Sequence, residues 1–280
     1  MIEATATART EFTSARVVLA FDLDGPTDEA LISGEIWRRP GYFTFCASGP
    51  HRGVPRILDV LRDKAVQATF FTPAWVVRTW PDLCRRIVKE GHEMAGHGDR
   101  HETFYGLDRE TQAGILRRSQ RTFTDILGQP ASGFRAPSGD LAPETLELLV
   151  EAGYTYSSSM RSGDRPYRHA RVALTEIPAK SLFDDYAAFA YHRAPDFPRG
   201  LDRIAPYEPV FRSWMAEIDA AAEEGLTVPT IWHPEIIGTP GRTVLMDEFI
   251  GHLVGRADVR IQRADEVAAE CEAEALRDLA

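Results

Sequence analysis

Short apolar runs alternate with helix-forming segments along almost the whole of this 280-residue chain. The apolar runs are bounded by turn residues, as buried strands are, and the segments between them have the period of amphipathic helices. The predicted strands are residues 16–21, 68–71, 93–96, 133–135, 154–157, 174–178, 227–232 and 259–262, and the predicted helices are residues 54–61, 81–90, 108–127, 143–152, 210–224, 244–254 and 265–279. About seven or eight such units predict a parallel α/β fold, and the length suits a single barrel.

The composition shows no break that would divide the chain, so we expect one domain over residues 16–280 after a flexible N-terminal tail, residues 1–15. Residues 26–50 form a long aromatic connection, which is either a lid or interface or an insertion that packs on the surface. Residues 158–208 are rich in Arg, Pro, Asp and Tyr and resist assignment. Both stretches could cover a neighbouring subunit, so a homo-oligomer is a candidate assembly.

The charge balance excludes one class of partner. Lys and Arg number 32 against 42 Asp and Glu, a formal net charge of −10, whereas binding phosphates requires clustered Lys and Arg. We therefore expect no nucleic acid and no membrane as partners. We expect a cytoplasmic protein. The three cysteines are scattered, no leader peptide is visible at the N-terminus, and no apolar run is long enough to span a bilayer.

Residues 90–102, EGHEMAGHGDRHE, carry the strongest single indication of chemistry. His97 and His101 have a spacing at which two imidazoles reach one metal ion, and the glycines on both sides of His97 favour a tight loop over a helix. By itself, His97 is equally well explained as a loop histidine bonded to backbone. Two histidines rarely complete a metal site, so we expect a carboxylate from another segment. The local alternatives to that carboxylate are Glu93, Asp99 and Glu102.

Other ionisable residues follow the predicted strands at the same end. Asp22 and Asp24 end the first strand, Arg135 ends the fourth, and His233 ends the seventh. In a (β/α) barrel the carboxyl ends of the strands form one face, and that face carries the chemistry. Taken singly, each residue has a commonplace explanation, since Asp and Gly are frequent in turns and a histidine before proline is more often structural. Their coincidence at strand ends predicts a site.

Asp22 and Asp24 are two residues apart, so their carboxylates point the same way while the strand continues. One of them can complete a site of two histidines and one carboxylate, and the other can act as a base. Such a site suits a divalent metal, with Zn²⁺ expected first and Co²⁺, Fe²⁺ or Mn²⁺ as alternatives. Water whose pKa the metal lowers would attack an acyl carbon, while His233 protonates the leaving amine and Arg135 keeps the base ionised.

These motifs resemble those of the polysaccharide deacetylase superfamily, also called the chitooligosaccharide deacetylase or NodB homology domain. The resemblance runs from Val17 to about Val267, and the order and spacing of its motifs are specific to the superfamily. The motifs are FDLD at residues 21–24, GHEMAGHGDRHE at 91–102, GFRAP at 133–137, EIP at 176–178 and IWHP at 231–234. The resemblance implies a distorted (β/α) barrel of about seven parallel strands.

Residue by residue, the resemblance also implies roles. Asp24, His97 and His101 match the metal ligands, and Asp22 matches the general base. Arg135 matches the residue that orients that base, and His233 matches the general acid. The backbone N–H of Ser138 matches a position that stabilises the tetrahedral oxyanion. Asp184 and Asp185 are further candidates for contact with the substrate or its oxyanion, although a solvated loop pair is their ordinary interpretation.

Four features depart from the usual extracellular members. Leu23 separates the two aspartates, Gly98 stands where Ser or Thr is usual, Ser138 replaces an aromatic residue of the sugar groove, and a tryptophan-bearing fourth motif is absent. This pattern resembles an intracellular branch, represented by a peptidoglycan deacetylase-like protein of Helicobacter. The resemblance includes relatives in that branch, among them cyclic imide hydrolases and metal-independent allantoinases, that open small C–N bonds instead.

The sequence therefore predicts a metal-dependent hydrolase of a non-peptide C–N bond that uses activated water. The substrate is either an N-acetyl sugar, including an oligosaccharide, or a small amide, cyclic imide or ureide, and the missing aromatic wall favours the small molecule. The alternative from another class is a catalytically inactive or metal-free homologue that binds a small ligand or a carbohydrate.

Overall fold

The computed structural model describes residues 14–28, 36–161, 163–190 and 204–277. The predicted flexible tail lies outside the described residues except for Ser14 and Ala15. Ala15 is fully buried and already belongs to the first strand, so the tail ends earlier than predicted.

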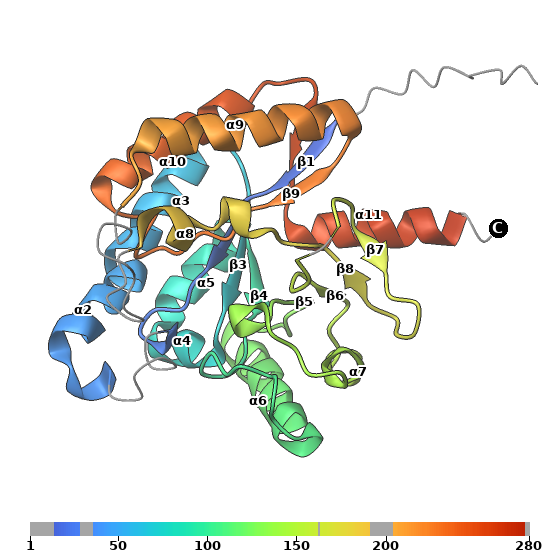
Figure 1. The fold of residues 1–280 in the computed structure, drawn as a ribbon. Coiled ribbons are helices and arrows are strands. Elements are labelled where there is room, and N and C mark those ends of the chain that lie inside the picture. The colour runs from blue at the N-terminus through green and yellow to red at the C-terminus, as the bar shows by residue number, and fades with distance from the viewer. Residues whose placement is uncertain (1–13, 29–35, 162, 191–203, 278–280) are drawn as a thin grey trace, which may run out of the picture.

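The strands form two sheets at the centre of the molecule (Figure 1). Within the described residues they are β1 (Ala15–Val18), β2 (Ala20–Asp22), β3 (Thr69–Thr72), β4 (Glu93–Gly96), β5 (Gly133–Phe134), β6 (Tyr156–Ser157), β7 (Tyr167–Arg168), β8 (Thr175–Glu176), β9 (Thr227–Pro229) and β10 (Val259–Ile261). Seven pair in the order β2-β3-β4-β5-β6-β8-β7 and three in the order β10-β1-β9. Only the pairing of β7 with β8 is antiparallel, so the predicted parallel α/β fold is confirmed.

β1 and β2 are one extended segment, interrupted at Leu19, that joins the two sheets. β1 pairs with β9, and β2 pairs with β3. Isolated parallel bridges then link Phe21 to Trp232 and Asp184 to Ile231. These contacts bring the sheets together without a continuous hydrogen-bonded ladder, which makes the fold an open, distorted form of the (β/α) barrel.

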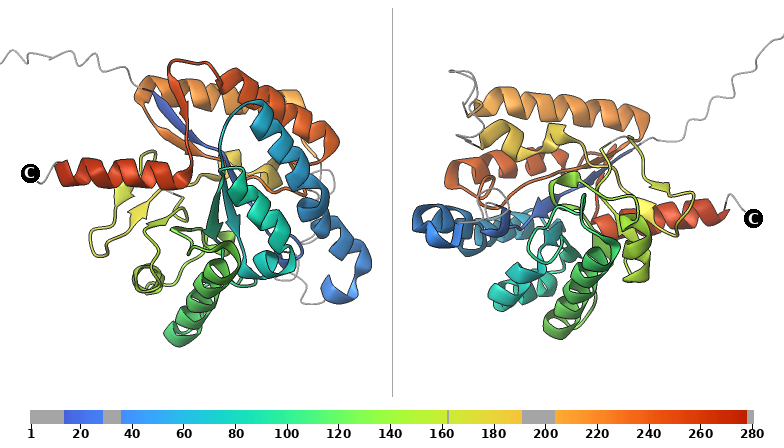
Figure 2. Two further views of the ribbon diagram at one scale, coloured as in Figure 1. Left: turned by 180° about the vertical axis from the view of Figure 1, so that it is seen from behind. Right: turned by 60° about the horizontal axis from the view of Figure 1, so that its bottom comes forward.

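Helices pack on the outside of the strands. In the described chain they are α2 (Pro40–Ser48), α3 (Val54–Asp63), α4 (Ala74–Thr79), α5 (Pro81–Lys89), α6 (Arg109–Leu127), α7 (Thr145–Glu151), α8 (Asp185–Phe189), α9 (Tyr207–Glu224), α10 (Pro240–Leu253) and α11 (Ala264–Arg277). α9 and α10 lie on one side of the strands, and α4, α5 and α6 lie on the other (Figures 1 and 2). Among the described helices, none is both long and apolar enough to cross a membrane.

One contiguous hydrophobic core includes side chains from Ala15 to Val259. On that basis we propose that residues 16–280 form a single domain. The caps of α6 agree with its predicted bounds. α6 starts after Asp108, whose carboxylate accepts a hydrogen bond from the Thr111 N–H at 2.8 Å, and it ends at Gly128 in the left-handed conformation with φ 80°.

Three of the described helices were not predicted: α2, α4 and α8, the last of which lies in the unassigned segment 158–208. Residues 26–50 were expected to form an irregular connection, but α2 lies within it. Tyr42 and Phe45 of this helix are 43% and 46% exposed. Its apolar residues therefore do not form one buried face, and the sequence does not show the hydrophobic periodicity of an amphipathic helix. α2 lies at the edge of the molecule (Figure 2), and none of its residues lines the cavity described below, so α2 is not a lid over that cavity. α4 is too short to show a period.

Candidate active site

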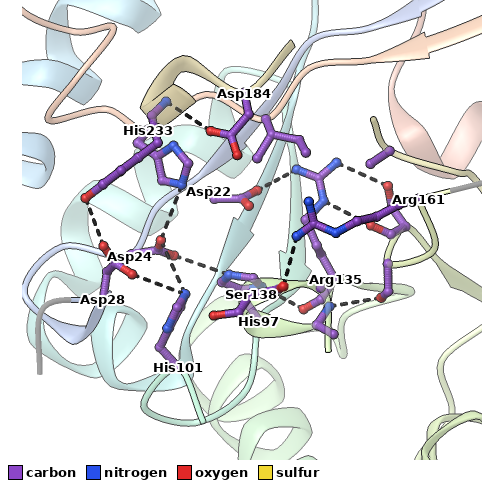
Figure 3. Close-up of a pocket in the computed structure, with 17 residues that line it drawn as sticks. Asp22, Asp24, Asp28, His97, His101, Arg135, Ser138, Arg161, Asp184 and His233 are labelled. Carbon is purple, nitrogen blue, oxygen red and sulfur yellow. Dashed lines mark hydrogen bonds and ion pairs between the residues drawn. The ribbon is translucent and has the colours of Figure 1, made fainter. Parts of the chain in front are cut away.

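A cavity of about 260 Å³ opens at the carboxyl ends of the central strands (Figure 3). Eight of the nine predicted site residues line it, namely Asp22, Asp24, His97, His101, Arg135, Ser138, Asp184 and His233. The ninth, Asp185, does not. The parallel strands bring these side chains together because β2, β4 and β5 all end at this face.

Asp24, His97 and His101 place three potential metal ligands side by side. Nε2 of His97 lies 3.5 Å from Oδ1 of Asp24, and Nε2 of His101 lies 3.5 Å from Oδ2. The ligand atoms of all three residues lie within 4.8 Å of one another. Two atoms that each lie about 2.0–2.1 Å from a tetrahedral Zn²⁺ are roughly 3.4 Å apart, so these separations suit a shared ion better than direct hydrogen bonds.

The burial of this cluster also indicates a cation. Asp24 is only 1% exposed, and its Oδ1 accepts no hydrogen bond from the described residues. Burial raises the pKa of Asp24 well above its usual value and lowers the pKa of His97 to about 3. A buried carboxylate among neutral imidazoles is stabilised when a positive charge lies between them. The three residues therefore fit a divalent metal ion.

The backbone determines which nitrogen of His97 faces the cluster. His97 follows β4 directly, and its Nδ1 lies 2.6 Å from the carbonyl oxygen of Arg135. A carbonyl can only accept a hydrogen bond, so Nδ1 carries the proton and Nε2 presents its lone pair towards Asp24. This is the tautomer that a metal ligand requires.

The loop after His97 folds back through two left-handed residues. Gly98 has φ 76° and His101 has φ 63°, and the ring centroids of the two histidines are 4.9 Å apart. A positive φ is strained for a residue other than glycine and is held only by its surroundings. Here Glu102 holds the loop, because its Oε2 accepts two hydrogen bonds, each of 2.9 Å, from the backbone N–H groups of the loop.

None of the local alternatives for the third ligand lines the cavity. Glu102 is used by its own loop. Asp99 pairs with Arg78 at 2.6 Å. Glu93 opens β4, at the end of the strand opposite the cavity, and accepts a hydrogen bond from Thr69.

Asp22 and Arg135 form a buried ion pair in the cavity wall. Nη1 of Arg135 donates to Oδ1 of Asp22 at 2.6 Å and to the Thr230 carbonyl at 3.3 Å, and Nε and Nη2 donate to the carbonyl and hydroxyl oxygens of Ser158. Burial opposes the charge on Asp22, but the positive charge of Arg135, followed by His97, lowers the pKa of Asp22 overall. Asp22 is thus ionised at neutral pH.

His233 forms a second buried pair, with Asp185. Nδ1 of His233 lies 2.7 Å from Oδ1 of Asp185, and Oδ2 accepts the backbone N–H groups of His233 and Ile237 at 3.0 and 3.1 Å. Burial lowers the pKa of His233, but the Asp185 charge and hydrogen bond outweigh it and raise that pKa well above its usual value. Nε2 lies 3.8 Å from Oδ2 of Asp24. The pairing with Asp185 favours the protonated form of the ring.

The prediction for Asp185 needs correction. The sequence suggested either a substrate contact or a solvated loop residue, but Asp185 is fully buried. It lies behind His233, away from the cavity, because β-like pairing of Asp184 with Ile231 brings the two segments together. Its carboxylate contacts both the ring and the backbone N–H of His233.

Ser138 and Asp184 do line the cavity. Ser138 has φ 58° and the following Gly139 has φ 66°, so the backbone turns along the cavity wall at this point. Oδ1 of Asp184 accepts the Tyr186 N–H at 3.0 Å and caps α8. Their roles towards a substrate stay predictions.

Three ionisable lining residues were not predicted: Asp28, Tyr186 and Arg161. The Tyr186 hydroxyl donates to Oδ2 of Asp28 at 2.8 Å, and its ring centroid lies 4.4 Å from that of His233. Asp28 lies shortly after the FDLD motif and Tyr186 directly after the candidate pair Asp184 and Asp185, and that nearness in the chain was their only signal. Arg161 lies in the segment that no pattern could assign.

Comparisons with known proteins agree with this arrangement. A family model described as polysaccharide deacetylase matches residues 39–157, which contain the histidine pair and Arg135. The peptidoglycan deacetylase of Helicobacter pylori is 24% identical over 245 residues, 77% of this chain and 82% of that protein. A chitooligosaccharide deacetylase of Bradyrhizobium is 45% identical over 117 residues, but these are 41% of this chain and 53% of that protein.

The similarity to one solved structure extends further along the chain. A structure from Mycobacterium smegmatis, assigned to the polysaccharide deacetylases, is 30% identical and superposes with a TM-score of 0.88. That superposition covers 98% of this chain and 96% of the other, so it includes the segments that carry Asp22, Asp24 and His233.

Proposed function

This chain belongs to the polysaccharide deacetylase family, and we propose that it hydrolyses an amide C–N bond with the help of a divalent metal ion. It is accordingly a hydrolase of carbon–nitrogen bonds other than peptide bonds. The observation that carries the metal-dependent mechanism is the convergence of three groups on one cavity. These are the Asp24, His97 and His101 cluster, an ionised Asp22 and a protonated His233.

Asp24, His97 and His101 would hold the ion. A divalent cation in such a site supplies Lewis-acid chemistry, since it polarises an acyl carbonyl and lowers the pKa of water. We favour Zn²⁺ because two imidazoles and one carboxylate at these separations suit tetrahedral coordination, and Co²⁺, Fe²⁺ and Mn²⁺ are the alternatives.

Asp22 is the proposed general base. Arg135 occupies one of its oxygens and keeps the carboxylate ionised, so the carboxylate can take a proton from the water molecule that attacks the acyl carbon. Because Arg135 is itself held by Ser158, the base has one orientation. The backbone N–H of Ser138 is the proposed donor to the oxyanion.

His233 is the proposed general acid. Its Nδ1–H donates to Asp185, which leaves the proton on Nε2 free to move to the amide nitrogen. The C–N bond breaks as that nitrogen is protonated, and the products are a carboxylic acid and an amine. Asp185 stays ionised throughout and holds the ring in place.

The size of the cavity limits the substrate. Its volume of about 260 Å³ lies just below the range of about 300–1,000 Å³ that is typical of pockets for drug-sized ligands. One N-acetyl sugar unit, free or at the end of an oligosaccharide, is the first candidate because of the family. A small amide, cyclic imide or ureide is the second, because the described lining contains serine, glycine and alanine with Tyr186 as its only phenyl-type ring.

Hydrolysis by purified, zinc-loaded protein would test the proposal. The panel contains N-acetylglucosamine, its oligomers, hydantoin and succinimide. We expect turnover of at least one member, with equal amounts of acid and amine for the acetylated sugars and ring opening for the cyclic imides. Asp22→Asn should lower kcat by about 10²- to 10⁴-fold, whereas Asp82→Asn, at a carboxylate whose side chain is 97% exposed on α5, should not change it.

Each other result has a defined meaning. Activity on the sugars alone would reject the small-molecule substrate, and activity on the cyclic imides alone would reject the sugar. Metal binding without turnover of any member would favour an inactive homologue that binds a ligand.

A further inference from the structure

Arg161 brings a second guanidinium to the cavity (Figure 3). Nη1 donates to Oγ of Ser181 at 2.6 Å, and Nη2 donates to the carbonyl oxygen of Ser138 at 2.9 Å. The guanidinium also rests on Gly139, where an added Cβ would lie 2.7 Å from Nη2. Two hydrogen bonds and the missing side chain at Gly139 therefore hold this arginine in one position.

These contacts leave Arg161 without a direct ion pair. No carboxylate of a described residue lies within 4.0 Å of its guanidinium. Arg135, the other arginine of the lining, differs in that it is paired with Asp22 at 2.6 Å. The remaining N–H donors of Arg161 are available at the cavity, and a guanidinium that is already ordered loses little side-chain entropy when it binds an anion.

Burial raises the pKa of the lining carboxylate of Asp184, and the charge of Arg161 is close enough to help lower that pKa, but the two groups lie beyond 4.0 Å of each other. The other negative charges of the lining lie elsewhere. Asp24 and Asp28 lie beside the histidines, across the cavity from Arg161 (Figure 3). The Asp22 charge is offset by Arg135, and that of Asp24 would be offset by a divalent cation. An anionic group would therefore be repelled near Asp28 and accommodated near Arg161.

We propose that Arg161 is a specificity-determining residue that binds a carboxylate of the substrate. The preferred substrate is then an amide that also carries a carboxylate, such as an N-acyl amino acid or an amino sugar with a carboxyl substituent. A carboxylate is small and planar, so it matches the guanidinium fork within this cavity. The inference rests on the proposed function, because it names the class of amide that the same site prefers.

Isothermal titration of zinc-loaded His233→Gln protein would test the inference, because this variant should bind substrates without turning them over. The ligands form two pairs that differ in the carboxylate: N-acetylglucosamine and its lactyl ether, and N-acetylglycinamide and N-acetylglycine. We expect the acid of at least one pair to bind about tenfold to a hundredfold more tightly than its neutral partner. The pair that shows this preference identifies the source of the carboxylate.

Adding Arg161→Gln should remove the preference, and Arg161→Lys should keep part of it. Arg121→Gln, at a side chain that is 83% exposed on α6, is the matched control and should leave the preference unchanged. Equal affinities within both pairs, or a preference that survives Arg161→Gln, would overturn the inference. Failure of the wild-type protein to hydrolyse any amide would instead reject the proposed function, and the binding ratio would still decide the role of Arg161.

Discussion

Gly98 sets the position of both histidines in the metal cluster. It has φ 76°, and a Cβ at this residue would lie 2.9 Å from Oε2 of Glu102, which closes the loop. Gly98→Ala should therefore destabilise the protein by about 1–3 kcal/mol and weaken zinc binding, because the loop must shift to relieve the contact. Urea unfolding with and without Zn²⁺ would measure both effects.

Gly106→Ala separates crowding from backbone strain. Gly106 has φ 86°, but an added Cβ would meet nothing within 4 Å. This variant should lose about 1 kcal/mol of stability and keep the zinc affinity of the wild type. Equal zinc affinities for the two alanine variants would show that Glu102 does not hold the metal loop.

Asp185 acts through His233. Asp185→Asn removes the negative charge beside Nδ1 and leaves only one side-chain oxygen to accept hydrogen bonds, where three are now accepted. We expect kcat to fall by about 10²- to 10⁴-fold with little change in KM, since the acid loses its charge partner and its orientation. Steady-state kinetics would measure this, with bound zinc determined on the same samples.

Asp125→Asn, at an exposed residue of α6, is the control and should match the wild type. A normal kcat for Asp185→Asn would contradict the positioning role, whereas loss of zinc together with kcat would place the effect on the metal cluster.

At the scale of elements, the sequence predicts the part of the site that follows strands. Asp22 ends β2, His97 follows β4 and Arg135 follows β5, and parallel strands place such residues on one face. His233 could be predicted in the same way, because the segment after β9 continues alongside β2 as far as Trp232. The roles of the individual side chains at these strand ends came from the resemblance to the deacetylase family and not from the hydrophobic periodicity of the sequence.

The sequence could not predict the parts of the site that irregular segments supply. Asp185 and Tyr186 lie in the short helix α8, and Arg161 lies in a loop after β6. These segments have no repeating burial pattern, because their positions depend on contacts such as that between Asp184 and Ile231, 47 residues apart. Secondary-structure propensity and hydrophobic periodicity depend on residues that are neighbours in the chain, so they do not predict such long-range pairings.

Glu93 joins the elements at the opposite end of the strands. It accepts hydrogen bonds from Thr69 of β3 and Tyr156 of β6 at 2.8 Å each, and from the Asp265 N–H at the start of α11 at 3.1 Å. Burial, followed by the charge of Asp265, raises the pKa of Glu93 from 4.5 to about 7. The folded protein therefore holds this proton more tightly than the unfolded chain does.

The sign of the pH dependence follows from that difference. The stability contributed by protonated Glu93 is complete below pH 4.5 and is lost as the pH rises through about 7. Glu93→Gln removes this titration, so the stability of the wild type relative to the variant should fall by about 3 kcal/mol over that range. Denaturant unfolding at several pH values would measure it.

Glu151→Gln, at a side chain that is 58% exposed, provides the matched control and should follow the wild type at each pH. A constant difference between Glu93→Gln and the wild type across the range would mean that the pKa of Glu93 is not raised in the folded state.

At the scale of the whole molecule, the site depends on closing the chain on itself. Asp22 and His233 are 211 residues apart in sequence but line one cavity. The alternation of strands and helices predicts that architecture, because parallel units place successive strand ends together. The alternation does not predict that the hydrogen-bonded ladder between the two sheets is interrupted. That interruption depends on the local break at Leu19 and on the isolated bridge between Phe21 and Trp232.

The central claim is that Asp24, His97 and His101 bind one divalent metal ion. Elemental analysis after chelation and reloading with Zn²⁺ tests it most directly, with thermal unfolding on the same samples. We predict one zinc per chain, stabilisation by about 2.7 kcal/mol at a zinc concentration a hundredfold above Kd, and loss of both in His101→Ala but not in His252→Ala, an exposed histidine of α10. Wild-type protein that retains no zinc and gains no stability, or His101→Ala protein that still binds one equivalent, would contradict it.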